Sequence, residues 1–356
     1  MNSATDPKSL INIQYLRAVA ALMVVWLHAR DHFSWVKTQF PSEAGASGVD
    51  LFFVISGFIM VYTTYGKNIT PGQFMARRLE RIAPLYWLAT LAVVIVAALA
   101  PALLKSTLLS SPHILASFAF IPMRSPAFPD NYWPLVIPGW TLNYEMAFYA
   151  VFAVTLWLQG VWRLLALGTV LAGVVLCGIA FNLQGVAGFY ANPIILIFLA
   201  GAIIGYGYAS GRLKPSQWGG ALMVSLGFAL WLGMQHVQGD YSFLRAGLPA
   251  TLIVIGFCRI PALQLTWLSW LSKLGDASYS IYLTHVFVLA FLRNVLQRIG
   301  ISIENATSGW LYMFLSLALS AGCGLLIFRF IEKFLAQKTA TLRLRTPSIA
   351  APIMAK

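Results

Sequence analysis

The chain has 356 residues, of which 59% are hydrophobic and only 10% are charged, and its formal net charge is +13. This composition is too apolar for an ordinary soluble domain, so it predicts an all-α polytopic membrane protein. In a soluble protein the positive charge would suggest a nucleic-acid partner, but here the placement of Lys and Arg indicates membrane topology and no nucleic acid is expected.

Apolar runs of about 20 residues recur along the chain, the length that one membrane-spanning helix needs. They predict ten spans. In chain order these are Ile11–Arg30, Gly48–Gly66, Ala83–Leu104, Trp140–Leu158, Arg163–Phe181, Pro193–Ala209, Trp218–His236, Phe243–Ile260, Ala277–Ile299 and Trp310–Ile331. A shorter run, Ile114–Met123, is too brief to span and is either re-entrant or interfacial, so the count rises to eleven if it also enters the membrane.

The basic residues orient these spans. With the N-terminus inside, the inner segments hold 16 of the 24 Lys and Arg residues and the outer side holds seven. Basic residues gather on the cytoplasmic side of membrane proteins, so both termini are expected to be cytoplasmic. The predicted organisation is a leader over 1–10 without a cleaved signal peptide, one transmembrane domain over 11–331 and a basic cytoplasmic tail over 332–356.

Arg17 and His28 both lie inside the first apolar run. Eleven residues make almost three helical turns, so the two share one helix face about 16 Å apart along the axis. Ionisable residues inside a span are costly and mark functional sites or polar cavities. The alternative for His28 is a structural histidine whose hydrogen bonds are satisfied.

The inner loop after the second run contains a second basic group. Thr70 and Gln73 form a capping box, and Pro84 is expected to end the short helix that follows. Arg78 and Arg81 are three residues apart and form a basic ridge, to which Arg77 also belongs. This ridge is either an anchor on anionic lipid or a phosphate clamp, since the Arg fork suits phosphate groups.

Glu145 is the one carboxylate well inside an apolar run. Pro138-Gly139 predicts a turn, and the helix that begins there places Glu145 in its first turn, where the helix dipole stabilises a carboxylate. The topology puts Glu145 at a depth similar to that of His28. The alternative is that Glu145 only caps the helix or pairs with a nearby Arg.

Two further groups have a structural and a functional interpretation. Ser56 and Gly57 in mid-span permit close approach of another helix, or contribute to a site. Ser278, Tyr282 and His285 share a helix face by their spacing of four and three. This polar stripe lines a cavity or forms hydrogen bonds between helices.

No pair of histidines has the spacing of a metal site, so no metal is expected. The three cysteines lie in apolar runs, where Cys packs as a small hydrophobic residue, and no disulfide is expected.

Taken in order, five segments resemble the acyltransferase-3 family of integral membrane acyltransferases. They run from Tyr15 to His28, Gly48 to Phe58, Arg78 to Pro84, Trp140 to Glu145 and Ser278 to His285. The resemblance covers about residues 10–331, and the first and fourth segments are most similar to bacterial exopolysaccharide acetyltransferases of the ExoZ type.

This resemblance implies an enzyme of the bacterial inner membrane that moves an acetyl group from cytoplasmic acetyl-CoA to a sugar hydroxyl of an exopolysaccharide or another cell-surface glycan. It implies functional roles for Arg17, His28, Arg78, Arg81 and Glu145. We expect the three arginines to bind the donor and His28 and Glu145 to be catalytic. The expected partners are the lipid bilayer, a glycan or lipid-linked oligosaccharide acceptor, and the machinery of polysaccharide synthesis and export.

Two chemical routes remain open at this point. His28 acts as general base on the acceptor hydroxyl, with Glu145 orienting it or stabilising the imidazolium, or His28 carries the acetyl group covalently. Two other classes of function also remain: a transporter or flippase that uses the same charges for proton transfer, and a scaffold of an export complex without catalysis.

Overall fold

The apolar runs form helices throughout the described part of the chain. The structure is a computed structural model and describes residues 10–31, 43–101, 104, 107–234, 243–263, 266–301 and 306–338. Within these ranges there is no β-strand. A helix satisfies its backbone N–H and C=O groups internally, which an apolar environment requires. The prediction of an all-α protein is confirmed for the described residues.

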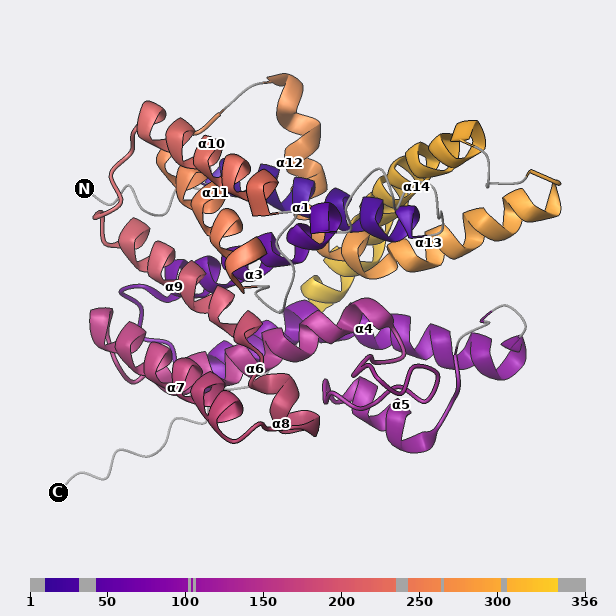
Figure 1. The fold of residues 1–356 in the computed structure, drawn as a ribbon, viewed down its shortest axis with the longest axis horizontal. Coiled ribbons are helices and arrows are strands. Elements are labelled where there is room, and N and C mark those ends of the chain that lie inside the picture. The colour runs from indigo at the N-terminus through magenta and orange to yellow at the C-terminus, as the bar shows by residue number, and fades with distance from the viewer. Residues whose placement is uncertain are drawn as a thin grey trace.

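The helices follow one another in the order shown in Figure 1. They are α1 (Ile11–Arg30), α3 (Glu43–Thr64), α4 (Pro71–Leu99), α5 (Ser111–Phe118), α6 (Trp140–Thr155), α7 (Gly160–Ala180), α8 (Gly185–Tyr190), α9 (Leu196–Ala209), α10 (Gln217–Gly233), α11 (Leu248–Arg259), α12 (Ser269–Asp276), α13 (Ser278–Arg298) and α14 (Ala306–Ile327). Short 3-10 or π-helical turns adjoin several of them: η3 (Ile137–Gly139), η4 (Pro193–Ile195), η6 (Phe243–Gly247), η7 (Thr266–Leu268) and η8 (Phe328–Glu332).

Six helices of the described chain are long and apolar enough to cross a membrane. They belong to α1, α3, α4, α7, α13 and α14 with its continuation. The remaining four predicted spans contain α6, α9, α10 and α11, which have 16, 14, 17 and 12 residues. A helix of 17 residues extends about 26 Å, less than the hydrocarbon thickness of about 30 Å. The predicted count of ten spans is therefore not confirmed.

The run Ile114–Met123, which would have raised the count to eleven, overlaps the end of α5, a helix of only eight residues that ends at Phe118. This helix packs beside α4, where the indole nitrogen of Trp87 donates a hydrogen bond to the carbonyl of Phe118 at 2.8 Å. It is too short to span, as the sequence predicted.

Helix α4 corrects one prediction. The capping box is present, because the Thr70 hydroxyl accepts from the Gln73 backbone and the Gln73 side chain accepts from the Thr70 backbone. However, the helix does not end at Pro84. It continues to Leu99 with Pro84 inside it. Proline removes one hydrogen bond within the helix, and the apolar segment that follows Pro84 stays helical because its backbone groups need partners within the helix.

The last helix extends beyond the predicted span Trp310–Ile331. The helix that begins as α14 continues through η8 to Lys338, so Glu332, at the start of the region expected as the tail, lies in a helix. The leader before residue 10 and the chain after residue 338 lie outside the described residues, as do the two predicted cytoplasmic termini.

Glycines bring α3 and α9 into close contact. A Cβ atom at Gly57 would lie 1.9 Å from the Phe198 carbonyl oxygen, and one at Gly201 would lie 1.9 Å from the Val54 carbonyl oxygen. Neither position can accept a side chain without separation of the helices. The sequence interpretation that Gly57 permits close approach is confirmed, and small residues serve this purpose between membrane helices.

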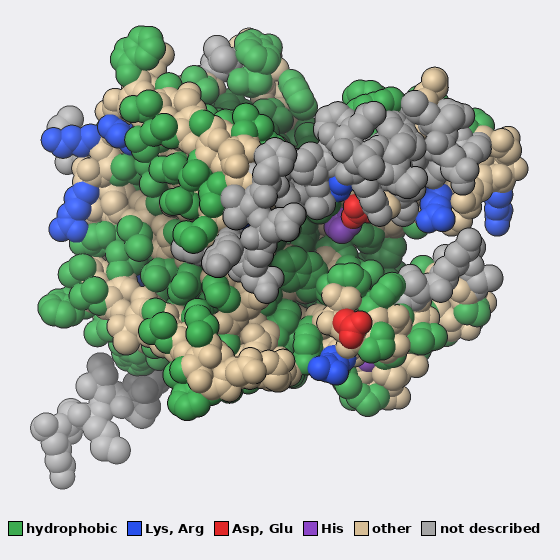
Figure 2. All heavy atoms as spheres, viewed as in Figure 1, with side chains coloured by type: hydrophobic (Ala, Val, Ile, Leu, Met, Phe, Trp, Pro, Cys, Tyr) green, Lys and Arg blue, Asp and Glu red, His purple; other side chains and the backbone are tan. Residues whose placement is uncertain are grey.

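Large apolar side chains remain exposed on the outside of this bundle. Figure 2 shows hydrophobic side chains over much of one face. The exposed large hydrophobic residues of the protein include Trp157, Phe181 and Trp218. An apolar surface of this extent is typical of proteins that contact a membrane.

Substitution of Gly57 tests the packing of α3 on α9. We expect Gly57→Ala to lower the free energy of unfolding by about 1–3 kcal/mol, because the added methyl group overlaps the Phe198 carbonyl. Gly173→Ala in α7 is the matched control, since a Cβ there meets no atom within 4 Å. The measurement is thermal unfolding of the purified proteins in the same detergent. Equal melting temperatures for the two variants would contradict the close packing.

Candidate active site

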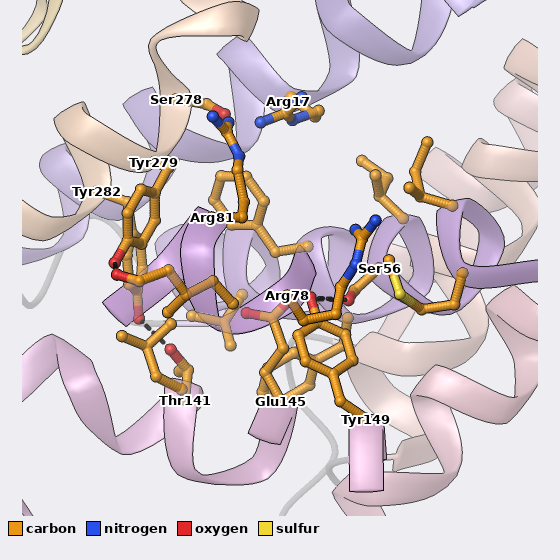
Figure 3. A pocket seen from close by; sticks show the side chains of 18 residues that line it. Arg17, Ser56, Arg78, Arg81, Thr141, Glu145, Tyr149, Ser278, Tyr279 and Tyr282 are labelled. Carbon is orange, nitrogen blue, oxygen red and sulfur yellow. Dashed lines mark hydrogen bonds between the residues drawn. The ribbon is translucent and has the colours of Figure 1, made fainter. Parts of the chain in front are cut away.

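One cavity of about 190 Å³ lies among five helices and gathers polar side chains from each of them (Figure 3). Its polar lining residues are Arg17 from α1, Ser56 from α3, Arg78 and Arg81 from α4, Thr141, Glu145 and Tyr149 from α6, and Ser278, Tyr279 and Tyr282 from α13. Four of the five residues expected to bind the donor or to be catalytic, all except His28, therefore line one cavity.

The three arginines give the cavity its positive charge. Nη1 of Arg17 donates to the Gln14 side chain at 3.1 Å. The guanidinium of Arg78 lies 5.6 Å from the centre of the Phe74 ring. Arg78 and Arg81 line the same cavity because residues three apart share a helix face. Arg77, the remaining member of the predicted ridge, is exposed and is not among the lining residues.

Glu332 is a partner of Arg81 that sequence reasoning missed. The two side chains form an ion pair, and the other Glu332 oxygen accepts a hydrogen bond from the Ser280 hydroxyl at 2.6 Å. Glu332 is buried and comes from η8. The sequence assigned this residue to a basic tail, and only the continuation of the helix brings it beside α4.

Glu145 is held by two hydroxyl groups of the cavity wall. Ser56 donates to Oε1 of Glu145 at 2.7 Å, and the Tyr149 hydroxyl donates to the same oxygen. Glu145 is also close enough to Arg17 to attract it electrostatically. The prediction that Glu145 lies in the first helical turn is wrong, because α6 begins at Trp140 and Glu145 is in its second turn. The dipole of that helix therefore stabilises it less than expected.

His28 lies outside the cavity lining and contacts a second histidine. Its ring stacks on that of His285 with centroids 5.1 Å apart and planes at 27°. The carboxylate that interacts electrostatically with His28 is that of Asp31, one turn further along the chain. The structure thus gives His28 different partners from the Glu145 expected at the same depth.

His285 has a fixed orientation. Its Nδ1 donates to the Tyr282 carbonyl at 2.6 Å, and the residue is fully buried. Because a carbonyl can only accept, Nδ1 carries the proton of the neutral ring and Nε2 carries the lone pair. No hydrogen-bond partner of Nε2 is found among the described residues. The sequence contained a signal for this residue, namely its place in the polar stripe of α13.

Tyr282 lies between the arginine cavity and the two histidines. Its ring lies 5.7 Å from that of Phe52 and 6.1 Å from that of His285. Its hydroxyl donates to the Pro138 carbonyl at 2.9 Å and forms a hydrogen bond with Thr141 at 2.8 Å. Both interpretations of the stripe therefore hold, since Ser278 and Tyr282 line the cavity and Tyr282 also bonds another helix.

Arg17 and His28 accordingly meet successive parts of the same α13 face. Arg17 lines the cavity together with Ser278, and His28 contacts His285 two turns further along α13. This arrangement offers an anion-binding cavity and a histidine pair on one pair of helices. Groups of three or more side chains suited to metal binding are not found in the described ranges.

Comparison with known proteins assigns the family. The family model for an acyltransferase domain, Acyl_transf_3, matches residues 10–329. Exopolysaccharide production protein ExoZ of Rhizobium meliloti (strain 1021) is 42% identical over 269 residues, which cover 74% of this chain and 83% of that protein. Peptidoglycan O-acetyltransferase OatA of Listeria monocytogenes serovar 1/2a is 36% identical over 93 residues, 25% of this chain and 14% of that protein.

No solved structure matches the chain significantly. Because the family model spans most of the sequence and the similarity to ExoZ extends over most of both chains, this protein belongs to the acyltransferase-3 family and is an acyltransferase.

Proposed function

We propose that this protein is a membrane O-acetyltransferase that moves an acetyl group from cytoplasmic acetyl-CoA to a sugar hydroxyl of an exopolysaccharide or another cell-surface glycan. The observation that carries the proposal is the cavity lined by Arg17, Arg78 and Arg81. Guanidinium groups bind phosphates through paired hydrogen bonds, and three of them suit a polyanionic donor. The printed names of ExoZ and OatA support a polysaccharide acceptor.

The donor site follows from the charges of the cavity. Arg78 and Arg81 hold the phosphates of coenzyme A, and Arg17 holds the donor where it enters the bundle. The carboxylate of Glu145, fixed by Ser56 and Tyr149, stabilises the Arg17 guanidinium beside this entrance. The thioester arm then extends along α1 towards His28, over about the 16 Å that eleven helical residues cover.

In the first chemical route, His28 acts as general base. It removes the proton of the acceptor hydroxyl, the hydroxyl oxygen attacks the thioester carbon, and the C–S bond breaks as the coenzyme thiolate leaves and takes up a proton. Asp31 is the neighbour that stabilises the charged ring in this route, and His285 stacks on that ring. In the second route, the His28 nitrogen attacks the thioester carbon, the C–S bond breaks, and the coenzyme thiolate leaves and takes up a proton. The acceptor hydroxyl then attacks the acetyl-histidine and loses its proton, and the imidazole is released.

The proposal places the enzyme in the bacterial inner membrane with its donor side in the cytoplasm. Its acceptor is a glycan or a lipid-linked oligosaccharide at the outer side, supplied by the machinery of polysaccharide synthesis and export. No metal enters either route.

Acetyl transfer in vesicles tests the proposed function. We expect inverted membrane vesicles that enclose the native glycan, supplied from outside with acetyl-labelled acetyl-CoA, to place label on the glycan. His28→Ala should lower this labelling by about 10²–10⁴-fold, the contribution of general acid–base catalysis. Both proteins must be present in equal amounts. If wild-type and His28→Ala vesicles label the glycan equally, the enzymatic proposal fails and a transporter becomes the leading explanation.

The arginines make a separate prediction about donor affinity. Arg78→Gln and Arg81→Gln should each raise the KM for acetyl-CoA about tenfold, because each loses a charge-assisted contact with phosphate, while kcat changes less. Arg77→Gln is the matched control on the same helix and should change KM by less than about twofold, since an exposed charge outside the cavity is screened by salt. An equal rise for all three variants would indicate a general surface effect instead of a donor site.

A further inference from the structure

Glu332 lies where the end of α14 meets α4 and α13. It is 5% exposed and belongs to η8, a π-helical turn. One carboxylate oxygen pairs with Nη1 of Arg81, and the other accepts from the Ser280 hydroxyl at 2.6 Å. Turns of this kind are frequent at functional sites. Both oxygens of Glu332 are thus engaged by side chains of other helices.

Arg81 stands between this carboxylate and the cavity. Arg81 lines the cavity, whereas Glu332 is not among the lining residues. The exposed fraction of the side chain is 40% for Arg81 and 5% for Glu332. A guanidinium has five N–H donors, and one carboxylate engages only part of them. The side of Arg81 that faces the cavity therefore remains available to a ligand while Glu332 holds the other side.

The backbone beside Arg81 is held by the same group of helices. The hydroxyl of Tyr279, next to Ser280 in α13, donates to the carbonyl of Ile82 at 2.6 Å. Pro84 has no N–H, so α4 lacks the helical hydrogen bond to the carbonyl of residue 80. Contacts from α13 and η8 thus fix Arg81 in a part of α4 where the helix itself has one bond fewer.

We propose that Glu332 is a positioning residue for donor binding: it holds the Arg81 guanidinium at the cavity wall so that its free N–H groups meet the anionic donor. This inference rests on the proposed function, in which Arg81 contacts coenzyme A phosphate. The opposite role, a carboxylate that competes with the donor, would require Glu332 to occupy the cavity, and it lies behind Arg81.

Binding of labelled coenzyme A to the purified full-length protein in nanodiscs tests this role without turnover. We expect Glu332→Gln to weaken binding about fivefold to tenfold, because the neutral amide holds the guanidinium less firmly than a carboxylate does. Glu80→Gln is the matched control. It removes a carboxylate next to Arg81 in sequence that does not line the cavity, and we expect less than about a twofold change for such a partly exposed charge.

A double-mutant cycle separates positioning from a general structural effect. If Glu332 acts through Arg81, adding Glu332→Gln to Arg81→Gln should not weaken binding further, because the group that it positions is already absent. Ser280→Ala supplies a milder variant that keeps the ion pair and removes only the hydroxyl, and it should weaken binding about twofold to threefold. It also keeps the test available if Glu332→Gln does not fold.

The outcomes are distinct. Unchanged or tighter binding in Glu332→Gln would overturn the positioning role, and tighter binding would indicate competition. If Glu332→Gln does not fold, unchanged binding in Ser280→Ala overturns it instead. Additive losses in the double mutant would overturn it as well. If the wild-type protein itself binds no coenzyme A, the proposed donor site fails; if it binds and Glu332→Gln binds equally well, only this inference fails.

Discussion

Charge placed inside an apolar bundle is the constraint on which the site depends. A guanidinium in an apolar environment requires a counter-charge or a polar cavity, because desolvation is otherwise costly. Here three arginines share one cavity, Glu332 pairs with Arg81 from behind, and Glu145 attracts Arg17 from within. These contacts join α1, α4, α6 and the end of α14, and the same arginines give the cavity a positive charge that suits an anionic ligand.

The site is divided by Tyr282. Tyr282 lines the arginine cavity, and its ring lies 6.1 Å from that of His285, which stacks on His28. The hydroxyl of Tyr282 is tied to α6 and to the turn that precedes it. Under the proposed function, binding of the donor phosphates and acyl transfer take place at different positions along α1 and α13. The thioester arm of the donor then has to pass the Tyr282 ring. Donor binding and acyl transfer therefore use the same two helices but different side chains.

Glycines in α3 and α9 and a proline in α4 also shape the cavity wall, through their effects on the backbone. The glycines of α3 and α9 allow the two helices to approach until a side chain no longer fits, which sets the position of Ser56 on the cavity wall. Pro84 interrupts the hydrogen bonds of α4 near Arg81, and the Tyr279 hydroxyl binds the backbone beside it. The carbonyl that loses its helical donor is that of residue 80, whereas the Tyr279 hydroxyl binds the carbonyl of Ile82, so α13 holds α4 beside the proline without replacing the lost bond.

The sequence alone determined the helical class, the capping box of α4, the close approach at Gly57 and four of the residues around the cavity, because each depends on local periodicity or on residue type. The pairing of charges was decided only by the tertiary structure. Arg81 and Glu332 are 251 positions apart, and Ser56 and Glu145 are 89 apart. Helical periodicity tells which side chains share a face, but not which distant helix meets that face. The expected contact of Glu145 with His28 rested on their similar depth. In the structure Glu145 binds Ser56, because α6 packs against α3. His28 stacks on His285, because α1 packs against α13.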